Sequence, residues 1–182
     1  ADRHCYREHR RGRSRRYKVR ARSYLDRELT VLEVKERDAR GITHKSRLER
    51  NFDHLSLEGA EVADFIAAHS GMRVSELQPS LSNSFRRITL LGRTRPQRIT
   101  LDVDISFTTK GAARRLRGVA VAEVKSSDTR NQTEVLRLFR GAGLRPQGFS
   151  KYCLGTALLN EGLRANRFLP ALRRLSRLEE VA

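Results

Sequence analysis

Alternating polar and apolar residues predict a β-strand over residues 17–25. Lys18, Arg20 and Arg22 fall on one face of this strand, because side chains along a strand alternate with a period of two. Three cations spaced about 7 Å apart in this way can follow a chain of phosphates. A solvated face of an ordinary sheet has the same pattern. The pattern of this strand alone does not distinguish a phosphate-binding face from a solvated one, so we compare it with the later segments of the chain.

Five further segments alternate in a similar way and are also predicted to be strands: 29–36, 42–51, 85–91, 98–107 and 118–126. The first three strands of the chain follow one another through short turns, which favours an antiparallel meander. Helical spacing of apolar residues predicts four helices: about 57–70, 131–140, 150–159 and 165–179. Residues 1–16 are basic and polar, and we expect them to form a solvated approach to the first strand.

The polar faces of the six strands carry more cations than acids. The cations are Lys18, Arg20, Arg22, Lys35, Lys45, Arg47, Arg87, Arg98 and Lys125, and the acids are Glu33, Glu49, Asp102, Asp104 and Glu123. In a flat sheet this charged face would be wet, whereas in a closed barrel it would line a tunnel. Such a tunnel needs water or a polyanion to fill it, because unpaired charges are costly in a dry interior. Periodicity leaves both arrangements open.

Composition points to a polyanionic partner. The chain of 182 residues has 38 Lys and Arg against 21 Asp and Glu, a net charge of +17. This charge favours nucleic acid, polyphosphate, a nucleotide or an anionic membrane surface. Seven Phe, four Tyr and no Trp offer few platforms for stacking bases, so we expect no specific nucleic acid.

The remaining composition bears on location and completeness. Two cysteines are too few for a disulfide framework, which favours the reducing cytoplasm. We see no apolar run of membrane-spanning length and no signal peptide at the start of the chain. Because the sequence begins without Met, we expect that it starts inside a longer chain.

Six short motifs occur in order along the chain: RYKVRARSY at 16–24, LEVK at 32–35, SFRR at 84–87, RITLD at 98–102, AEVK at 122–125 and FSKYCLG at 149–155. As an ordered set they resemble the VTC domain, in its bacterial-type form, over about residues 3–159. The VTC domain is a branch of the triphosphate tunnel metalloenzymes. The Ser-Lys-Tyr at a helix start is the most distinctive of these motifs.

The resemblance implies an α+β fold in a single domain over residues 1–182. Its centre would be an antiparallel β-barrel, with strands at about 15–51 and 85–126 and helices packed outside. A helical C-terminal segment would follow at about 131–179. Members of the family have eight strands around a tunnel that binds triphosphate, and the first of these strands is absent from this sequence.

The resemblance also assigns site residues. Seven basic side chains would hold or flank the phosphates: Arg20, Arg22, Lys35, Lys45, Arg87, Arg98 and Lys151. Of these, Arg20, Arg22, Arg87 and Lys151 would contact a bound anion. Glu123 would bind the divalent metal, Mn²⁺ or Mg²⁺.

Several acids keep a structural alternative. Glu33 with Lys35 is also typical of an ion pair, and Glu123 could pair with a neighbouring arginine. For Asp102 and Asp104 we favour ion pairs over metal binding. The five histidines share no metal-ligand spacing, and Cys153 is expected in the core.

Two classes of function remain open. The first is metal-dependent phosphoryl transfer on a nucleoside triphosphate or inorganic polyphosphate, foremost polyphosphate synthesis from ATP. A triphosphatase is the alternative enzyme, because Gly148 stands where some members of the family have a further lysine. The second class is a non-catalytic module that binds polyphosphate or RNA. The role of Glu123 distinguishes the enzyme from the binding module, because a carboxylate repels phosphates unless a metal lies between them.

Overall fold

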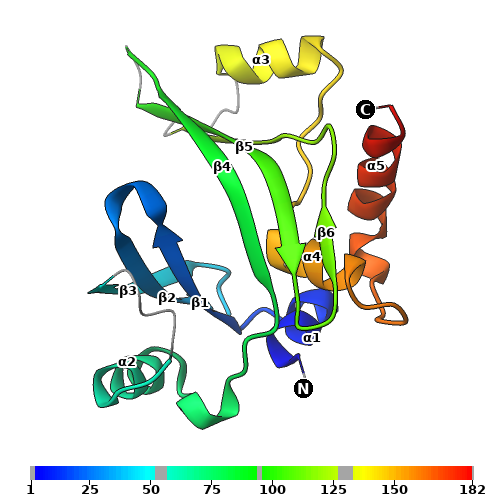
Figure 1. Ribbon diagram of the computed structural model, residues 1–182. Coiled ribbons are helices and arrows are strands. Elements are labelled where there is room, and N and C mark those ends of the chain that lie inside the picture. The colour runs from blue at the N-terminus through cyan, green and yellow to red at the C-terminus, as the bar shows by residue number, and fades with distance from the viewer. Residues whose placement is uncertain (1–2, 52–56, 94–95, 127–132, 182) are drawn as a thin grey trace. The chain divides into compact units, whose positions relative to one another are not determined.

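The computed structural model describes residues 3–51, 57–93, 96–126 and 133–181, and the chain divides into two compact units, residues 1–80 and 81–182. Each unit contains one antiparallel sheet, and the chain ends in a helix (Figure 1). These features confirm the predicted α+β class with antiparallel sheets. Within the described residues, no helix has the length and apolar character needed to cross a membrane.

Unit 1 contains a three-stranded sheet and two α-helices: α1 (His4–Arg11), β1 (Arg16–Tyr24), β2 (Leu29–Arg37), β3 (Thr43–Asn51) and α2 (Ala60–Ser70). Two short 3₁₀ turns, Leu25–Arg27 and Val74–Glu76, complete the regular structure among the described residues of this unit. The strand order β1-β2-β3 with antiparallel pairing confirms the predicted meander.

The two faces of this sheet differ as the sequence predicts. Leu32 and Val34 of β2 are buried and form a core cluster with Val62 and Ile66 of α2. Lys35 lies next to those apolar positions in the alternation and so falls on the opposite face. Helix α2 therefore packs against the apolar face of the sheet.

The solvated approach that the sequence predicts for residues 1–16 is wrong for the part of this segment that forms helix α1. Instead of a solvated approach, His4–Arg11 forms a helix that ends at Gly12, whose φ of 72° provides the left-handed cap. Tyr6 is fully buried and anchors the helix. Arginine is a good helix former, so a basic segment with one apolar anchor can be helical without a clear apolar stripe.

The described residues of unit 2 form four strands, whereas the sequence predicts three. They are β4 (Ser82–Leu91), β5 (Gln97–Thr108), β6 (Ala113–Arg115) and β7 (Val121–Ser126). Strand β5 is central, with β4 along one edge and both β6 and β7 along the other. The extra strand, β6, has only three residues, and they lie between the predicted strands 98–107 and 118–126. It is too short for alternation to reveal it.

A bulge interrupts β5 at Asp104. The register shifts opposite Ser84 to Arg86 of β4, and Asp104 has a φ of 53°. The side chain of Asp104 pairs with Arg86 and Arg115. Strict alternation predicts that Asp102 and Asp104 share a face of the sheet. In the structure they lie on opposite faces, because one residue in the left-handed region breaks the period of two.

After the sheet of unit 2, the described residues form three α-helices: α3 (Glu134–Gly141), α4 (Lys151–Leu158) and α5 (Leu169–Glu180). A 3₁₀ turn, Asn166–Phe168, precedes α5. Residues 131 and 132 of the first predicted helix lie outside the described residues. The Ser150 hydroxyl caps α4 by accepting a hydrogen bond from the Cys153 N–H at 3.3 Å. Cys153 is fully buried, which confirms its place in the core.

Helix α4 lies directly against β5 at Gly155. A Cβ atom added at Gly155 would lie 2.5 Å from the ring of Phe107, which is fully buried. Only glycine allows this close approach, and it places the first residue of α4, Lys151, beside the sheet.

Candidate functional site

The charged face of unit 1 is organised around Glu33, which is only 5% exposed. In the strand register Glu33 lies directly between Arg20 of β1 and Arg47 of β3. Arg20 Nη2 lies 2.7 Å from Glu33 Oε1, and Lys35 Nζ lies 3.0 Å from the same oxygen. Arg47 Nε donates to Oε2 at 3.3 Å. One buried carboxylate thus holds three cations.

The pKa values on this face reflect crowding of positive charge. Burial opposes ionisation of Glu33, but the charges of Arg20 and Lys35 outweigh it and lower the pKa of this carboxyl. The pKa of Arg20 is lowered mainly by burial and then by the positive charge of Arg22. The pKa of Lys35 is lowered mainly by burial and then by the positive charge of Arg20. An anion bound here would relieve this repulsion among the cations.

The other two predicted residues of unit 1 extend the same face. Arg22 follows Arg20 on β1, lies over the Tyr24 ring and donates from Nη1 to the Tyr24 hydroxyl at 3.1 Å. Lys45 of β3 is exposed and lies opposite Lys35 in the register. The structure therefore places Arg20, Arg22, Lys35 and Lys45 on one face.

The charged face of unit 2 is organised around Asp102, which is 2% exposed. Arg87 binds both of its oxygens, Nε to Oδ1 at 2.6 Å and Nη2 to Oδ2 at 2.7 Å. Lys151 Nζ, from the start of α4, also donates to Oδ2. The ring of Phe85 underlies both cations, with its centroid 5.2 Å from Arg87 Cζ and 4.4 Å from Lys151 Nζ. The structure thus brings the predicted residues Arg87 and Lys151 together.

Glu123, the predicted metal ligand, lies on β7 beside this cluster. Its side chain is 53% exposed, and its Oε1 lies 3.1 Å from Lys125 Nζ. Burial opposes its ionisation, but the hydrogen bond from Lys125 and the charges of Lys125, Arg87 and Lys151 lower the pKa of this carboxyl. The sequence suggests an arginine as the alternative partner of Glu123, but in this structure the partner is Lys125.

Arg98, the last of the predicted residues, is exposed on β5. It lies opposite Lys125 in the register and two residues before Thr100, which faces Glu123. By strand alternation it shares the face of Asp102. It adds positive charge at the outer part of this face.

The donors around Glu123 fit a metal that is bound together with phosphate. Within the described ranges, no group of three or more His, Cys, Asp or Glu side chains could hold a metal ion. The Thr100 hydroxyl, opposite Glu123, is buried and has no hydrogen-bond partner among the described residues. Mg²⁺ is commonly held by one or two carboxylates with phosphate oxygens and waters. One exposed carboxylate meets that requirement only when a substrate supplies the other ligands.

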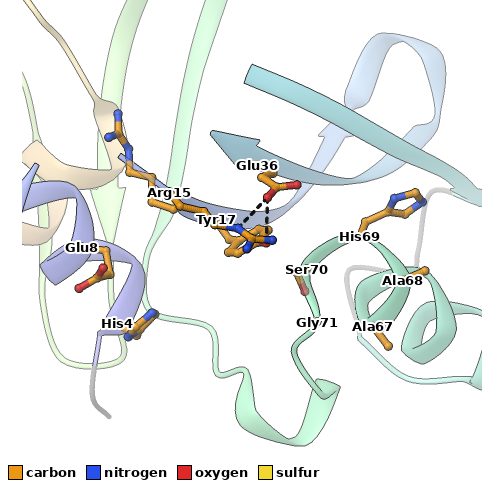
Figure 2. A pocket seen from close by; sticks show the side chains of 11 residues that line it. His4, Glu8, Arg15, Tyr17, Glu36, Ala67, Ala68, His69, Ser70 and Gly71 are labelled. Atoms are coloured by element: carbon orange, nitrogen blue, oxygen red, sulfur yellow. Dashed lines mark hydrogen bonds and ion pairs between the residues drawn. The ribbon is translucent and has the colours of Figure 1, made fainter. Parts of the chain in front are cut away.

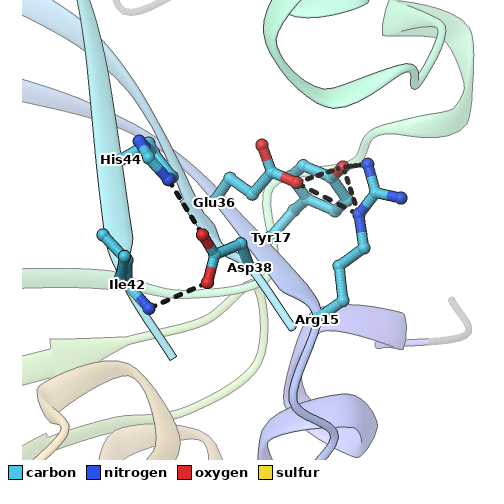
Figure 3. Close-up of polar contacts among 6 residues, drawn as sticks. All are labelled: Arg15, Tyr17, Glu36, Asp38, Ile42 and His44. Carbon is cyan, nitrogen blue, oxygen red and sulfur yellow. Dashed lines mark hydrogen bonds and ion pairs between the residues drawn. The ribbon is translucent and has the colours of Figure 1, made fainter. Parts of the chain in front are cut away.

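A separate pocket of about 530 Å³ in unit 1 lies between α1, the start of β1 and the C-terminal end of α2 (Figure 2). Its polar groups already pair with one another: Arg15 Nε and the Tyr17 hydroxyl both donate to Glu36 Oε1, at 3.1 and 2.9 Å. Next to them, Asp38 accepts from the Ile42 N–H and pairs with His44 (Figure 3). Tyr17 has the opposite strand parity to Arg20, so this pocket is not part of the charged face.

The sequence analysis does not include Phe85 in the site, and it does not show that Glu33 and Asp102 lie at the centres of the two charged faces. Phe85 was not considered, although its spacing of two from Arg87 places both on one face of β4. Ion pairing was among the interpretations for Glu33 and Asp102, and the structure confirms it for both. No sequence signal connects Asp102 with Lys151, because they are 49 residues apart.

The comparisons with known proteins agree with this geometry. No curated protein and no solved structure matches the chain. The family model of the VTC domain matches residues 1–160, which include the strands that carry both charged faces and the helix that begins with Lys151. The chain therefore belongs to the VTC domain family.

Proposed function

We propose that this protein transfers phosphoryl groups between ATP, or another nucleoside triphosphate, and inorganic polyphosphate, with the synthesis of polyphosphate as its main reaction. Membership of the VTC domain family supports a polyphosphate-related or tunnel-enzyme function. One observation carries the finer proposal. In each unit, one face of the sheet gathers lysines and arginines around a single buried carboxylate. We propose that each of these faces binds phosphate groups of the substrate.

The chemistry of phosphoryl transfer matches these side chains. The reaction requires little covalent participation by the protein, because positioning and charge neutralisation supply most of the rate. Arg20, Arg22, Arg87 and Arg98 would bind non-bridging phosphate oxygens through their planar guanidinium groups. The lysines would act as point charges: Lys35, Lys45 and Lys151.

Glu123 would hold Mn²⁺ or Mg²⁺ together with oxygens of the substrate. When bound, such an ion neutralises charge on the phosphates and orients them. The exposed carboxylate of Glu123 is available for this role, and its low pKa keeps it ionised at neutral pH. Lys125 would keep the carboxylate in place before substrate arrives.

The direct test is to incubate the full-length protein with ATP and Mn²⁺ and to separate the products on a gel. A polymerase forms long polyphosphate chains, whereas a triphosphatase releases only short phosphates. Replacing Arg20 and Arg22 with alanine should weaken triphosphate binding strongly. The control pair, Arg173 and Arg174, lies on α5 and not on a strand of either charged face. Equal losses from the two pairs would mean that net charge, rather than a site, binds the anion.

A non-catalytic polyanion-binding module is the second candidate, and one observation favours it. The buried acids of the two charged faces, Glu33 and Asp102, already pair with protein cations. Glu123→Gln distinguishes the two candidates, because it removes the proposed metal ligand and one negative charge. In an enzyme, turnover of ATP should fall by about 10²-fold, equivalent to about 2.7 kcal/mol of barrier, while triphosphate binding without metal is maintained or tightens. Unchanged turnover would exclude Glu123 as the ligand, and a parent protein without turnover would support the binding module.

A further inference from the structure

We propose that Asp102 is a positioning residue, which holds Arg87 and Lys151 in a fixed arrangement ready to receive a phosphate group. This inference rests on the proposed function, because it takes the charged face of unit 2 to be an anion-binding surface. It assigns a role in binding to a buried acid that makes no contact with the anion itself.

The contacts of Asp102 leave its two cations little freedom. Both carboxylate oxygens accept from the fork of Arg87, and Oδ2 also accepts from Lys151. The Phe85 ring adds a second constraint, because both cations lie over it. Arg87 comes from β4 and Lys151 from α4, so this carboxylate sets the distance between a strand cation and a helix cation.

The outer parts of both cations are still accessible. The side chains of Arg87 and Lys151 are 33% and 17% exposed, whereas that of Asp102 is 3% exposed. An anion can therefore reach the cations but not the acid.

Net charge alone gives no reason for an aspartate at this position. A negative charge beneath an anion site cancels one cation and repels the phosphate. Preorganisation does give a reason, since each long side chain that binding must immobilise lowers the affinity through its lost conformational entropy. If Asp102 fixes both side chains in advance, the phosphate meets them already ordered. The pKa of Asp102 is consistent with this role: burial opposes ionisation, but Arg87 and Lys151 lower the pKa and keep the carboxylate charged.

Asp104 provides a matched control on the same strand. It also pairs with two arginines, Arg86 and Arg115, but on the other face of the sheet. Asp102→Asn and Asp104→Asn each remove one negative charge from unit 2. The two variants therefore change net charge equally and release different cations.

The experiment measures the affinity of the full chain for inorganic triphosphate, without metal, by titration calorimetry. Positioning predicts that Asp102→Asn weakens binding by about ten-fold, while Asp104→Asn leaves it unchanged or slightly tighter. Net charge alone predicts that both variants bind more tightly. Binding by Asp102→Asn as tight as the parent's, or tighter, would overturn the inference. A parent that does not bind triphosphate would overturn the proposed function instead.

Two further measurements separate positioning from a structural role. Lys151→Ala should cost much less affinity in the Asp102→Asn protein than in the parent, because the lysine is already misplaced there. Additive losses would contradict positioning. In the absence of triphosphate, acylation of the Lys151 amine, followed by mass spectrometry, should be faster in Asp102→Asn and unchanged in Asp104→Asn. Equal rates in the parent and both variants would also overturn the inference.

Phe85→Leu keeps the test decisive if Asp102→Asn does not fold. Leucine retains apolar bulk but removes the ring that lies beneath Arg87 and Lys151. A loss of about three-fold in triphosphate affinity is expected from the lost cation–ring contacts, with thermal unfolding measured to confirm a folded protein. Unchanged affinity in a folded Phe85→Leu protein would reject the arrangement that the inference requires.

Discussion

Adding one methyl group at Gly155 tests whether the packing of α4 against β5 determines the position of Lys151. The new Cβ would lie 2.5 and 2.7 Å from Phe107 Cδ1 and Cγ, and 2.9 Å from Leu81 Cδ2. Phe107 is fully buried, so its ring cannot move into solvent. The helix or the strand has to shift instead. Overpacking of this kind costs about 1–3 kcal/mol, and contacts with rigid ring atoms place this site at the upper end.

Helix propensity offsets part of that loss, because alanine is favoured over glycine in a helix by about 1 kcal/mol. We therefore expect Gly155→Ala to lower the free energy of unfolding by about 2 kcal/mol, the difference between these two values. For a unit of this size the melting temperature falls by about 4–8 °C per kcal/mol. Urea denaturation and thermal melts would measure both quantities.

The control is Gly148→Ala, because no atom lies within 4 Å of a Cβ added at that glycine. It should change the stability little. Because Lys151 begins α4, Gly155→Ala should also weaken triphosphate binding, whereas Gly148→Ala should not. A Gly155→Ala protein with the parent's stability and affinity would refute the view that this contact positions the lysine.

Three further predictions concern the fold beneath the site. Ile66→Ala should lower the free energy of unfolding in urea by about 2–5 kcal/mol, because Ile66 is fully buried between α2 and the sheet. Ser150→Ala should cost about 1 kcal/mol in the same assay, because it removes the cap of α4. The pKa values of Glu33 and Asp102 are lowered by folding, so their contribution to stability is present above about pH 4 and is lost as the pH falls through the lower folded values. Acid titration of Asp102→Asn should therefore show a smaller loss of stability than the parent.

The faces of the strands could be predicted from sequence because strand geometry enforces them. In unit 1 two alternate residues of β2, Leu32 and Val34, are apolar and pack on α2. The residues that alternate with them then have to face the other way, which places Glu33 and Lys35 together. The meander and the end of α2 at Gly71 also arise from local signals.

The bulge at Asp104 could not be predicted, because nothing in the alternating sequence from Arg98 to Phe107 marks it. A single residue with positive φ reverses the face on which the later residues of the strand lie. Helix α1 was missed for a different reason. Tyr6 is its one fully buried side chain, and one apolar residue gives no periodicity to detect.

The acids of the charged faces show why counting charges does not locate a site. In a net charge of +17, each acid only subtracts from the total. In the structure, Glu33 and Asp102 are 5% and 2% exposed, and protein cations already surround their oxygens. A buried carboxylate held in this way cannot accept a metal without releasing those cations, which would leave buried charges unpaired. Glu123 is 53% exposed and pairs with a lysine that is itself half exposed. Exposure therefore distinguishes the buried acids, which are already paired with protein cations, from Glu123, the acid that we propose as a metal ligand.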